Sequence, residues 1–265
     1  MKKGAGSRPP SLRHSWSLTP GEARNLQIGL RAKLRFSPLR RSPRTVAGAD
    51  ISHLRFGRRA VAEVVVFSFP DLERIEESLA VGEVALPYVP GLLSFREGPL
   101  LERAFEGLRR RPNLVLFDGQ GIAHPRGLGI ASHLGLRLGV PSVGCTKSRL
   151  WGEAAEPPDE KGAWSPLREK EEKVVGGLLR TRKGVKPVYI SPGHRIDLEG
   201  AIRIALASSP RYRIPAPSGQ PTSARTKSAD AWGSSEKKPP RRGAGAFSNF
   251  GDSSNSRRPG GGGYP

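Results

Sequence analysis

Beyond residue 215 the chain has no long or branched aliphatic side chains, and this limits where a folded domain can lie. Residues 216–265 contain no Leu, Ile, Val or Met, and Gly, Ser and Pro dominate the segment. Such a sequence buries too little apolar surface to offset the entropy lost on ordering. We therefore expect a folded domain over residues 16–215, a flexible basic segment over residues 1–15 and a disordered tail over residues 216–265.

The charge balance indicates a polyanionic partner. Lys and Arg number 44 against 24 Asp and Glu, which gives a formal net charge of +20. Many dispersed cations can each neutralise a phosphate and release counterions, so nucleic acid is the favoured partner. An anionic membrane surface fits less well without an amphipathic anchor. The alternative is a basic, ribosome-type protein without catalytic activity.

Cysteine content and hydropathy favour a cytoplasmic protein. The single cysteine, Cys145, excludes an internal disulfide and a thiolate zinc cluster. No apolar run long enough for a signal peptide follows the basic amino terminus, and the most apolar run, residues 60–69, contains Glu63. We expect a monomer that neither enters a membrane nor is exported.

The folded part begins with a helix and continues as strands and then as alternating helices and strands. Thr19, Pro20 and Glu22 match a capping box, which predicts a helix start. Three β-rich runs follow, over residues 45–51, 60–69 and 74–81, and predict an antiparallel meander. Helices are expected over residues 95–108, 128–138 and 198–207, and strands over residues 113–118, 142–145, 173–182 and 187–191. This order predicts an α/β fold with a mixed sheet flanked by helices.

Two aspartates stand where predicted strands end. Asp50 and Asp118 each close a short apolar run and are followed by turn-prone residues. Two carboxylates at one sheet edge repel unless a divalent cation lies between them, and oxygen ligands of this kind suit Mg²⁺. Either aspartate alone fits equally well as a turn-capping residue. Glu97, expected near a helix start, is a candidate third metal ligand or a partner of the helix dipole.

The segment from Asp118 to Arg126 carries an unusual set of polar residues. Gly119 and Gly121 let backbone amides approach a phosphate or a base closely. His124 is a candidate for moving a proton or orienting a phosphate, and Arg126 for gripping a phosphate. The alternative for each of these two side chains is a solvated position in a loop.

A short rigid loop holds an aromatic residue. Pro87 and Pro90 flank Tyr88, and Gly91 follows. Proteins that read one altered base often insert such a side chain into the base stack and take the base into a pocket. The alternative is an aromatic residue that only covers the domain surface.

Two further candidates follow later strands. Lys147 comes after the predicted strand at residues 142–145, and His194 comes after the strand at residues 187–191. We expect both to border one cleft at the carboxyl ends of the strands. A lysine there can stabilise charge on a phosphoryl transition state, and a histidine can orient water. A surface lysine and a turn histidine are the alternatives.

Taken together, these blocks resemble the endonuclease V family over about residues 16–215. The matching blocks, in family order, are residues 46–50, 87–91, 95–99, 118–126, 144–147 and 191–196. The resemblance implies an RNase H-like fold. It also implies Mg²⁺, with Mn²⁺ as a substitute, held by Asp50, Asp118 and Glu97 with His194 nearby. The Tyr88 loop would then separate the strands.

The implied reaction is hydrolysis of the second phosphodiester bond on the 3′ side of a deoxyinosine in DNA. It leaves a 3′-hydroxyl and a 5′-phosphate and does not remove the base. Preference for inosine in RNA is one alternative, and a basic binding protein with impaired catalysis is another. The intact Asp50, Glu97 and Asp118 argue against the last.

One departure from the family pattern lies at the carboxyl terminus. Family members usually continue past residues 213–215 into a basic helix, whereas here the low-complexity segment follows. We hypothesise that a frameshift near residue 217 replaced the usual terminus.

Overall fold

The computed structural model describes residues 12, 14–54, 58–84, 86–170 and 172–210. The expected tail and most of the expected basic amino-terminal segment lie outside these residues. The strands are β1 (Thr45–His53), β2 (Arg59–Ser68), β3 (Arg74–Glu83), β4 (Leu114–Asp118), β5 (Ser142–Thr146), β6 (Trp164–Arg168), β7 (Val174–Leu179) and β8 (Val188–His194). The helices are α1 (Pro20–Arg31), α2 (Leu93–Glu106), α3 (Ile130–Leu138) and α4 (Leu198–Ala207).

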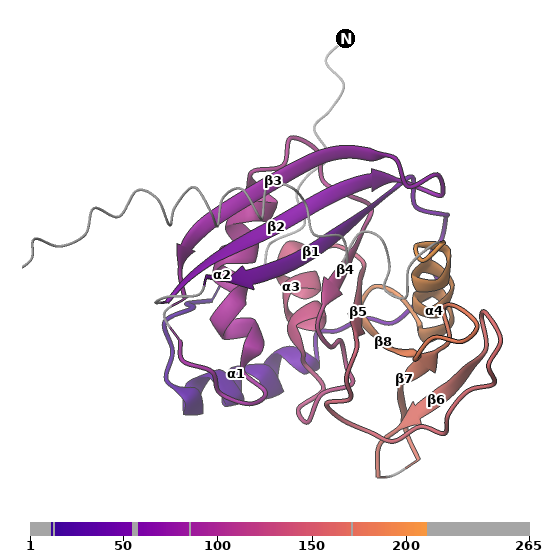
Figure 1. Cartoon of the computed structure of the whole chain (residues 1–265). Helices are drawn as coiled ribbons and strands as arrows, with labels where there is room; N and C mark the ends of the chain where they lie inside the picture. Colours follow the sequence, from indigo (N-terminus) through magenta and orange to yellow (C-terminus); the bar gives the residue numbers. More distant parts are fainter. Residues whose placement is uncertain (1–11, 13, 55–57, 85, 171, 211–265) are drawn as a thin grey trace, which may run out of the picture.

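All eight strands form one mixed sheet in the order β3-β2-β1-β4-β5-β8-β7-β6 (Figure 1). Strands β1, β2 and β3 pair antiparallel as a meander, and β1, β4 and β5 run parallel. Strands β8, β7 and β6 then continue antiparallel on the other side of β5. The predicted meander, parallel centre and flanking helices are thereby confirmed. Strand β6 was not predicted from the sequence.

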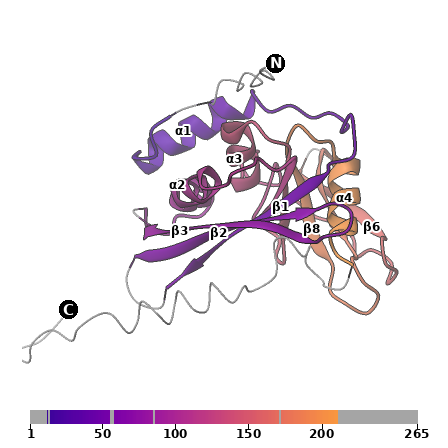
Figure 2. The same ribbon diagram turned by 90° about the horizontal axis from the view of Figure 1, so that it is seen from above.

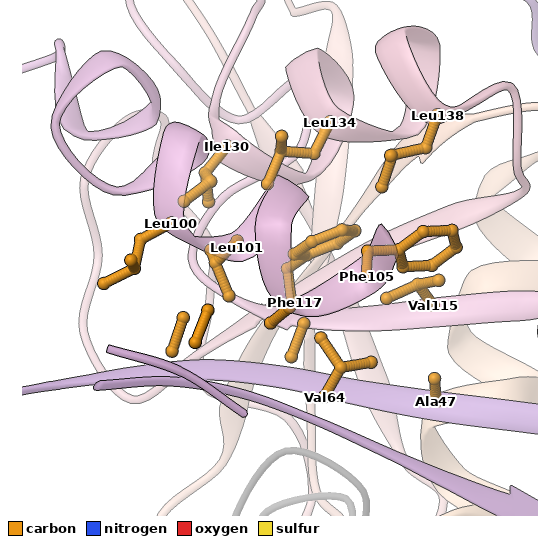
Figure 3. Packing of buried hydrophobic residues seen from close by; sticks show 14 of the residues in the cluster. Ala47, Val64, Leu100, Leu101, Phe105, Val115, Phe117, Ile130, Leu134 and Leu138 are labelled. Carbon is orange, nitrogen blue, oxygen red and sulfur yellow. The ribbon is translucent and has the colours of Figure 1, made fainter. Parts of the chain in front are cut away.

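Alternate residues of the central strands face two different apolar cores. On one face, Phe117 and its neighbours on β1 and β4 pack against Leu101 of α2 and Leu134 of α3 (Figure 3). On the other face, Leu116 packs with residues of α4 such as Ile202. Figure 2 shows α1, α2 and α3 together on one side of β2 and β3. This two-sided cover explains why β4 is a continuous apolar run.

The capping box predicted at α1 is present. The Thr19 hydroxyl accepts from the Glu22 backbone N–H, and the Glu22 carboxylate accepts from the Thr19 backbone N–H. These bonds satisfy backbone donors that a helix start otherwise leaves exposed. No helix among the described residues is both long and apolar enough to cross a bilayer.

A chain of neutral imidazoles fastens the segment before α1 to the helices beneath it. His133 lies fully buried in α3, with its Nε2 2.7 Å from His14 Nε2 and its Nδ1 2.9 Å from Ser94 Oγ. His14 Nδ1 donates to the Ser15 carbonyl at 2.8 Å, so His14 Nε2 accepts the proton of His133 Nε2. Ser94 then donates to His133 Nδ1. In this tautomer, adding a proton to His14 Nε2 would place two N–H groups face to face.

Unfolding free energy should therefore fall as the pH is lowered from 7 to 5. Burial is the first cause of the lowered pKa values of His14, His124, His133 and His194. Such groups take up protons on unfolding, so their contribution is complete above the usual histidine pKa of about 6.5 and declines below it. Each extra proton held by the unfolded chain is worth up to about 1.4 kcal/mol per pH unit.

Denaturant unfolding at several pH values measures this slope. A His133→Gln variant should show a shallower decline than the parent chain, because it takes up one proton fewer on unfolding. Identical slopes would contradict the neutral imidazole chain.

Candidate functional site at the carboxyl edge of the sheet

The strand register brings the two predicted aspartates side by side. Parallel pairing of β1 with β4 aligns Ala49 with Phe117, and Asp50 and Asp118 are the next residues in this register. Neighbouring strands lie about 4.8 Å apart, so the two carboxylates share one edge of the sheet. Asp118 is exposed, and Asp50 also lies opposite the buried Glu63 of β2.

Glu97 reaches the same edge from α2. The helix starts at Leu93, two residues earlier than expected, so Glu97 lies in the second turn and no acidic residue occupies the first. The predicted alternative, a helix-dipole partner, is therefore wrong. Glu97 is buried, and desolvation raises the pKa of its carboxyl, to which the negative charge of Asp50 also contributes. Asp50 and Glu97 are thus electrostatic neighbours.

His53 belongs to this centre and was missed by the sequence analysis. Its Nε2 lies 3.0 Å from Glu97 Oε1, and its Nδ1 lies 3.5 Å from an Arg96 guanidinium nitrogen. Side chains alternate between the two faces of the sheet along β1, so His53 and Asp50 lie on opposite faces. His53 lies on the face that α2 covers. The available signal was weak, because the strand was predicted to end at residue 51.

The donor set fits a hard divalent cation. Among the described residues, no three His, Cys, Asp or Glu side chains converge as a closed metal cage. An open carboxylate pair is nevertheless what Mg²⁺ commonly uses, since water and phosphate oxygens complete its shell. A cation near Asp50 and Asp118 would also offset the repulsion that contributes to the raised pKa of Glu97.

A pocket of about 310 Å³ adjoins this edge. Its lining brings together the predicted Tyr88, Gly91, Gly119 and His124 from two separate loops. Its size lies at the lower end of small-ligand sites, which span about 300–1,000 Å³. Tyr88 is 69% exposed, and Pro87 and Pro90 beside it are exposed as well. The aromatic ring therefore stands at the rim of the pocket.

One backbone carbonyl joins the two loops. The Gly91 oxygen accepts from Gln27 Nε2 at 3.0 Å, from His124 Nε2 at 3.0 Å and from Arg126 Nη2 at 2.8 Å. Gly91 itself has φ +76°, and a Cβ there would lie 2.5 Å from Arg126 Nη2. The positive φ favours glycine here, and an added Cβ would also require the Arg126 guanidinium to shift.

These bonds give His124 and Arg126 protein partners. His124 Nδ1 accepts from the Arg126 backbone N–H at 3.2 Å, so its Nε2 carries the proton given to Gly91. Burial, followed by the charge of Arg126, lowers the pKa of His124 to about 4. The imidazole is neutral near pH 7 and braces the loop. Arg126 also donates to Gln27 Oε1.

The glycines Gly119 and Gly121 lie tightly packed behind the pocket. Gly119 has φ +149°, and a Cβ there would lie 2.3 Å from an Ile130 methyl carbon. The Gly121 N–H donates to Ser191 Oγ at 2.7 Å, so it points into the protein. Close backbone approach is thus present at both positions, although only Gly119 lines the pocket.

Lys147 and His194 do not border one cleft, as was expected. Asp118 pairs with Cys145, and the exposed Lys147 follows two residues later at the same edge. His194 instead pairs with Ser142, at the amino end of β5. Strand β8 runs antiparallel to β5, so its carboxyl end lies at the opposite edge of the sheet. His194 therefore lies away from Asp50 and Asp118, and its predicted place in the catalytic centre is wrong.

Comparison with known proteins agrees with this geometry. A model of the Endonuclease V family matches residues 28–221. The Endonuclease V of Methanothrix thermoacetophila is 51% identical over 204 residues, covering 77% of this chain and 89% of that protein.

Solved structures are similar as well. The Endonuclease V of Streptomyces avermitilis superposes with a TM-score of 0.77 at 38% identity, covering 83% of this chain and 96% of that one. The Endonuclease V of Ciona intestinalis, crystallised with a 24mer DNA containing an inosine followed by a ribo-adenosine, gives a TM-score of 0.66 at 26% identity. That comparison covers 82% of this chain and 96% of the other.

Replacing Gly91 should loosen the pocket. We expect Gly91→Ala to lower the unfolding free energy by about 1–3 kcal/mol, because alanine is strained at this positive φ and its Cβ meets Arg126. The matched control is Gly29→Ala in α1, where an added Cβ meets nothing within 4 Å. The control should gain up to about 1 kcal/mol. Denaturant unfolding measures both, and equal effects would contradict the proposed constraint.

Proposed function

Because the chain belongs to the endonuclease V family, and is therefore a nuclease, we propose that it nicks DNA beside deoxyinosine. The bond cut would be the second phosphodiester on the 3′ side of the lesion, leaving a 3′-hydroxyl and a 5′-phosphate. The substrate class is supported by the Ciona relative, which was crystallised on DNA containing an inosine. The net charge of +20 suits a polyanionic substrate.

The single observation that carries the proposal is the adjacency of Asp50 and Asp118 next to the pocket. The pocket wall includes Gly119, which directly follows Asp118 in the chain. A base held in the pocket would therefore keep its own strand close to the paired carboxylates. Recognition and hydrolysis would be coupled by position, which is the main contribution a rigid site makes to such a reaction.

The family is one of metal-dependent nucleases, and the proposed cofactor is Mg²⁺, with Mn²⁺ as a substitute. Asp50 and Asp118 would hold the ion, and Glu97 would complete the acidic centre. The ion would supply polarisation of the scissile phosphate and a more acidic bound water. Lys147, at the same edge, would stabilise the negative charge that develops on the phosphate.

The rim of the pocket suits extrusion of a single base. Tyr88 would insert into the base stack, held forward by Pro87 and Pro90. The pocket, which Gly91, Gly119 and Gln120 help to line, would then receive the hypoxanthine base. His124 and Arg126 would act on the base indirectly, by fixing the Gly91 carbonyl.

Inosine in RNA is a second candidate substrate. The DNA in the Ciona complex carries a ribo-adenosine directly after the inosine. A ribonucleotide at that place supplies a 2′-hydroxyl, the group by which proteins distinguish RNA from DNA. Nicking of matched DNA and RNA strands, each with one inosine, in Mg²⁺ separates the two candidates.

Substituting one metal-binding aspartate should abolish nicking. Asp118→Asn keeps the shape of the side chain but removes its charge, so we expect a loss of about a hundredfold or more in nicking rate. Salt-sensitive binding of the same strand should persist. The control is Asp71→Asn, at an exposed aspartate between β2 and β3. Equal nicking by Asp118→Asn and the parent would refute the assignment.

Removing the aromatic ring at the pocket rim should weaken discrimination. Stacking of a base on an aromatic side chain is worth about 1–3 kcal/mol. Tyr88→Ala should therefore lower the ratio of nicking rates on inosine and adenine strands by about 5- to 150-fold. Phe36→Ala, at another exposed aromatic residue, should leave this ratio unchanged. An unchanged ratio in Tyr88→Ala would count against the wedge.

A further inference from the structure

A second cleft lies at the opposite edge of the sheet from the carboxylates. It measures about 430 Å³ and is formed by the chain after α1, the end of α3 and the end of β8. The residues that line it include Lys33, Arg35, His194 and Arg195. Along β5, Ser142 beside His194 stands three residues from Cys145 beside Asp118, which is about 10 Å. The cleft is therefore separate from the proposed nuclease site.

The charge in this cleft is strongly unbalanced. The charged residues that line it are the cations Lys33, Arg35 and Arg195. Within the described residues, none of these three forms an ion pair with a carboxylate. The ends of α1 and α3 each contribute about half a negative charge. The two helix ends together contribute about one negative charge, and the three cations contribute three positive charges, so a surplus of about two positive charges remains. Capping of the helices therefore accounts for only part of the positive charge.

His194 adds a directed donor to the cleft. Its Nδ1 accepts from the Arg35 backbone N–H at 3.4 Å, so the neutral ring carries its proton on Nε2. That Nε2–H has no hydrogen-bond partner among the described residues, although His194 lines the cleft. Burial and the nearby charges of Arg195 and Arg35 lower the pKa of His194 to about 4. The ring is thus a neutral hydrogen-bond donor near pH 7.

The backbone around the cleft is held in an unusual conformation. Arg195 has φ +53°, a backbone conformation that residues other than glycine rarely adopt. It is kept there by its N–H, which donates to the Arg35 carbonyl at 2.7 Å, and by its Nη1, which donates to the Gly139 carbonyl at 2.9 Å. These bonds also join all three segments that line the cleft.

We propose that this cleft is an anion site that binds a phosphate group, with Lys33, Arg35 and the His194 Nε2–H as its contacts. A phosphate carries up to two negative charges, which matches the surplus of positive charge. Arg195 fixes the shape of the cleft through Gly139. The phosphate group belongs either to a nucleic-acid backbone that passes this edge or to a free phosphate ion.

The first arm of the test uses inorganic phosphate on the full chain at constant ionic strength, with chloride as the reference salt. The imidazole NMR signal of His194, assigned by its absence in His194→Asn, is followed during the titration. We expect a saturable shift that chloride does not produce. Lys33→Gln combined with Arg35→Gln should weaken phosphate affinity at least tenfold. Arg110→Gln combined with Lys161→Gln removes the same charge at exposed positions elsewhere and should not.

The second arm uses an undamaged DNA duplex without a divalent cation, so it is independent of nicking. Each neutralised phosphate contributes about 0.9 to the slope of log affinity against log salt. If the slope of the Lys33/Arg35 variant is smaller in magnitude by about 0.9 than that of the control variant, the site binds a backbone phosphate. An unchanged slope together with a saturable phosphate shift identifies the free ion. Absence of a saturable shift, or equal weakening by the control variant, overturns the proposal.

Discussion

The geometry of the pocket depends on the three hydrogen bonds to the Gly91 carbonyl. A carbonyl oxygen has two lone pairs, so donors from Gln27, His124 and Arg126 hold it more firmly than a turn alone would. The donors come from α1 and from the loop after β4, whereas the acceptor belongs to the Tyr88 loop. One atom therefore fixes two loops that are more than 30 residues apart in the chain. Because the arginine is charged, its bond is the strongest of the three.

Strand direction decides which predicted residues meet. The sequence pointed to Asp50 and Asp118 because each ends an apolar run. Asp118 does end β4, whereas β1 continues past Asp50 to His53, so the expected strand end at Asp50 is wrong. Their adjacency comes from the parallel register of β1 with β4. The same reasoning failed for His194, because a strand end does not reveal whether the strand runs parallel or antiparallel. The short strand β6 was missed since its alternation is interrupted by Pro166. Local pattern thus predicted most elements, while long-range register determined the site.

The role of polar side chains was the least predictable part of the site. His124 and Arg126 were expected to contact phosphate, but their bonds run within the protein. His53 was overlooked, yet it contacts Glu97. Apart from the local bond between His124 and the Arg126 backbone, the partners lie 33 or more residues away in the chain, so no local spacing indicates them. A buried polar atom must find a partner somewhere, but only the folded chain determines which one.

The distribution of charge is compatible with the proposed cation site in a strongly basic chain. A net charge of +20 would repel a divalent ion at long range, yet charges beyond about 8–10 Å are screened at physiological ionic strength. Asp50 and Asp118 would act on a bound cation at a few ångströms, where screening is weak, and Glu97 is partly withdrawn from water. In the proposed reaction the dispersed cations would attract a polyanion from a distance, and the clustered acids would then act on it locally. The two requirements are compatible because they operate over different distances.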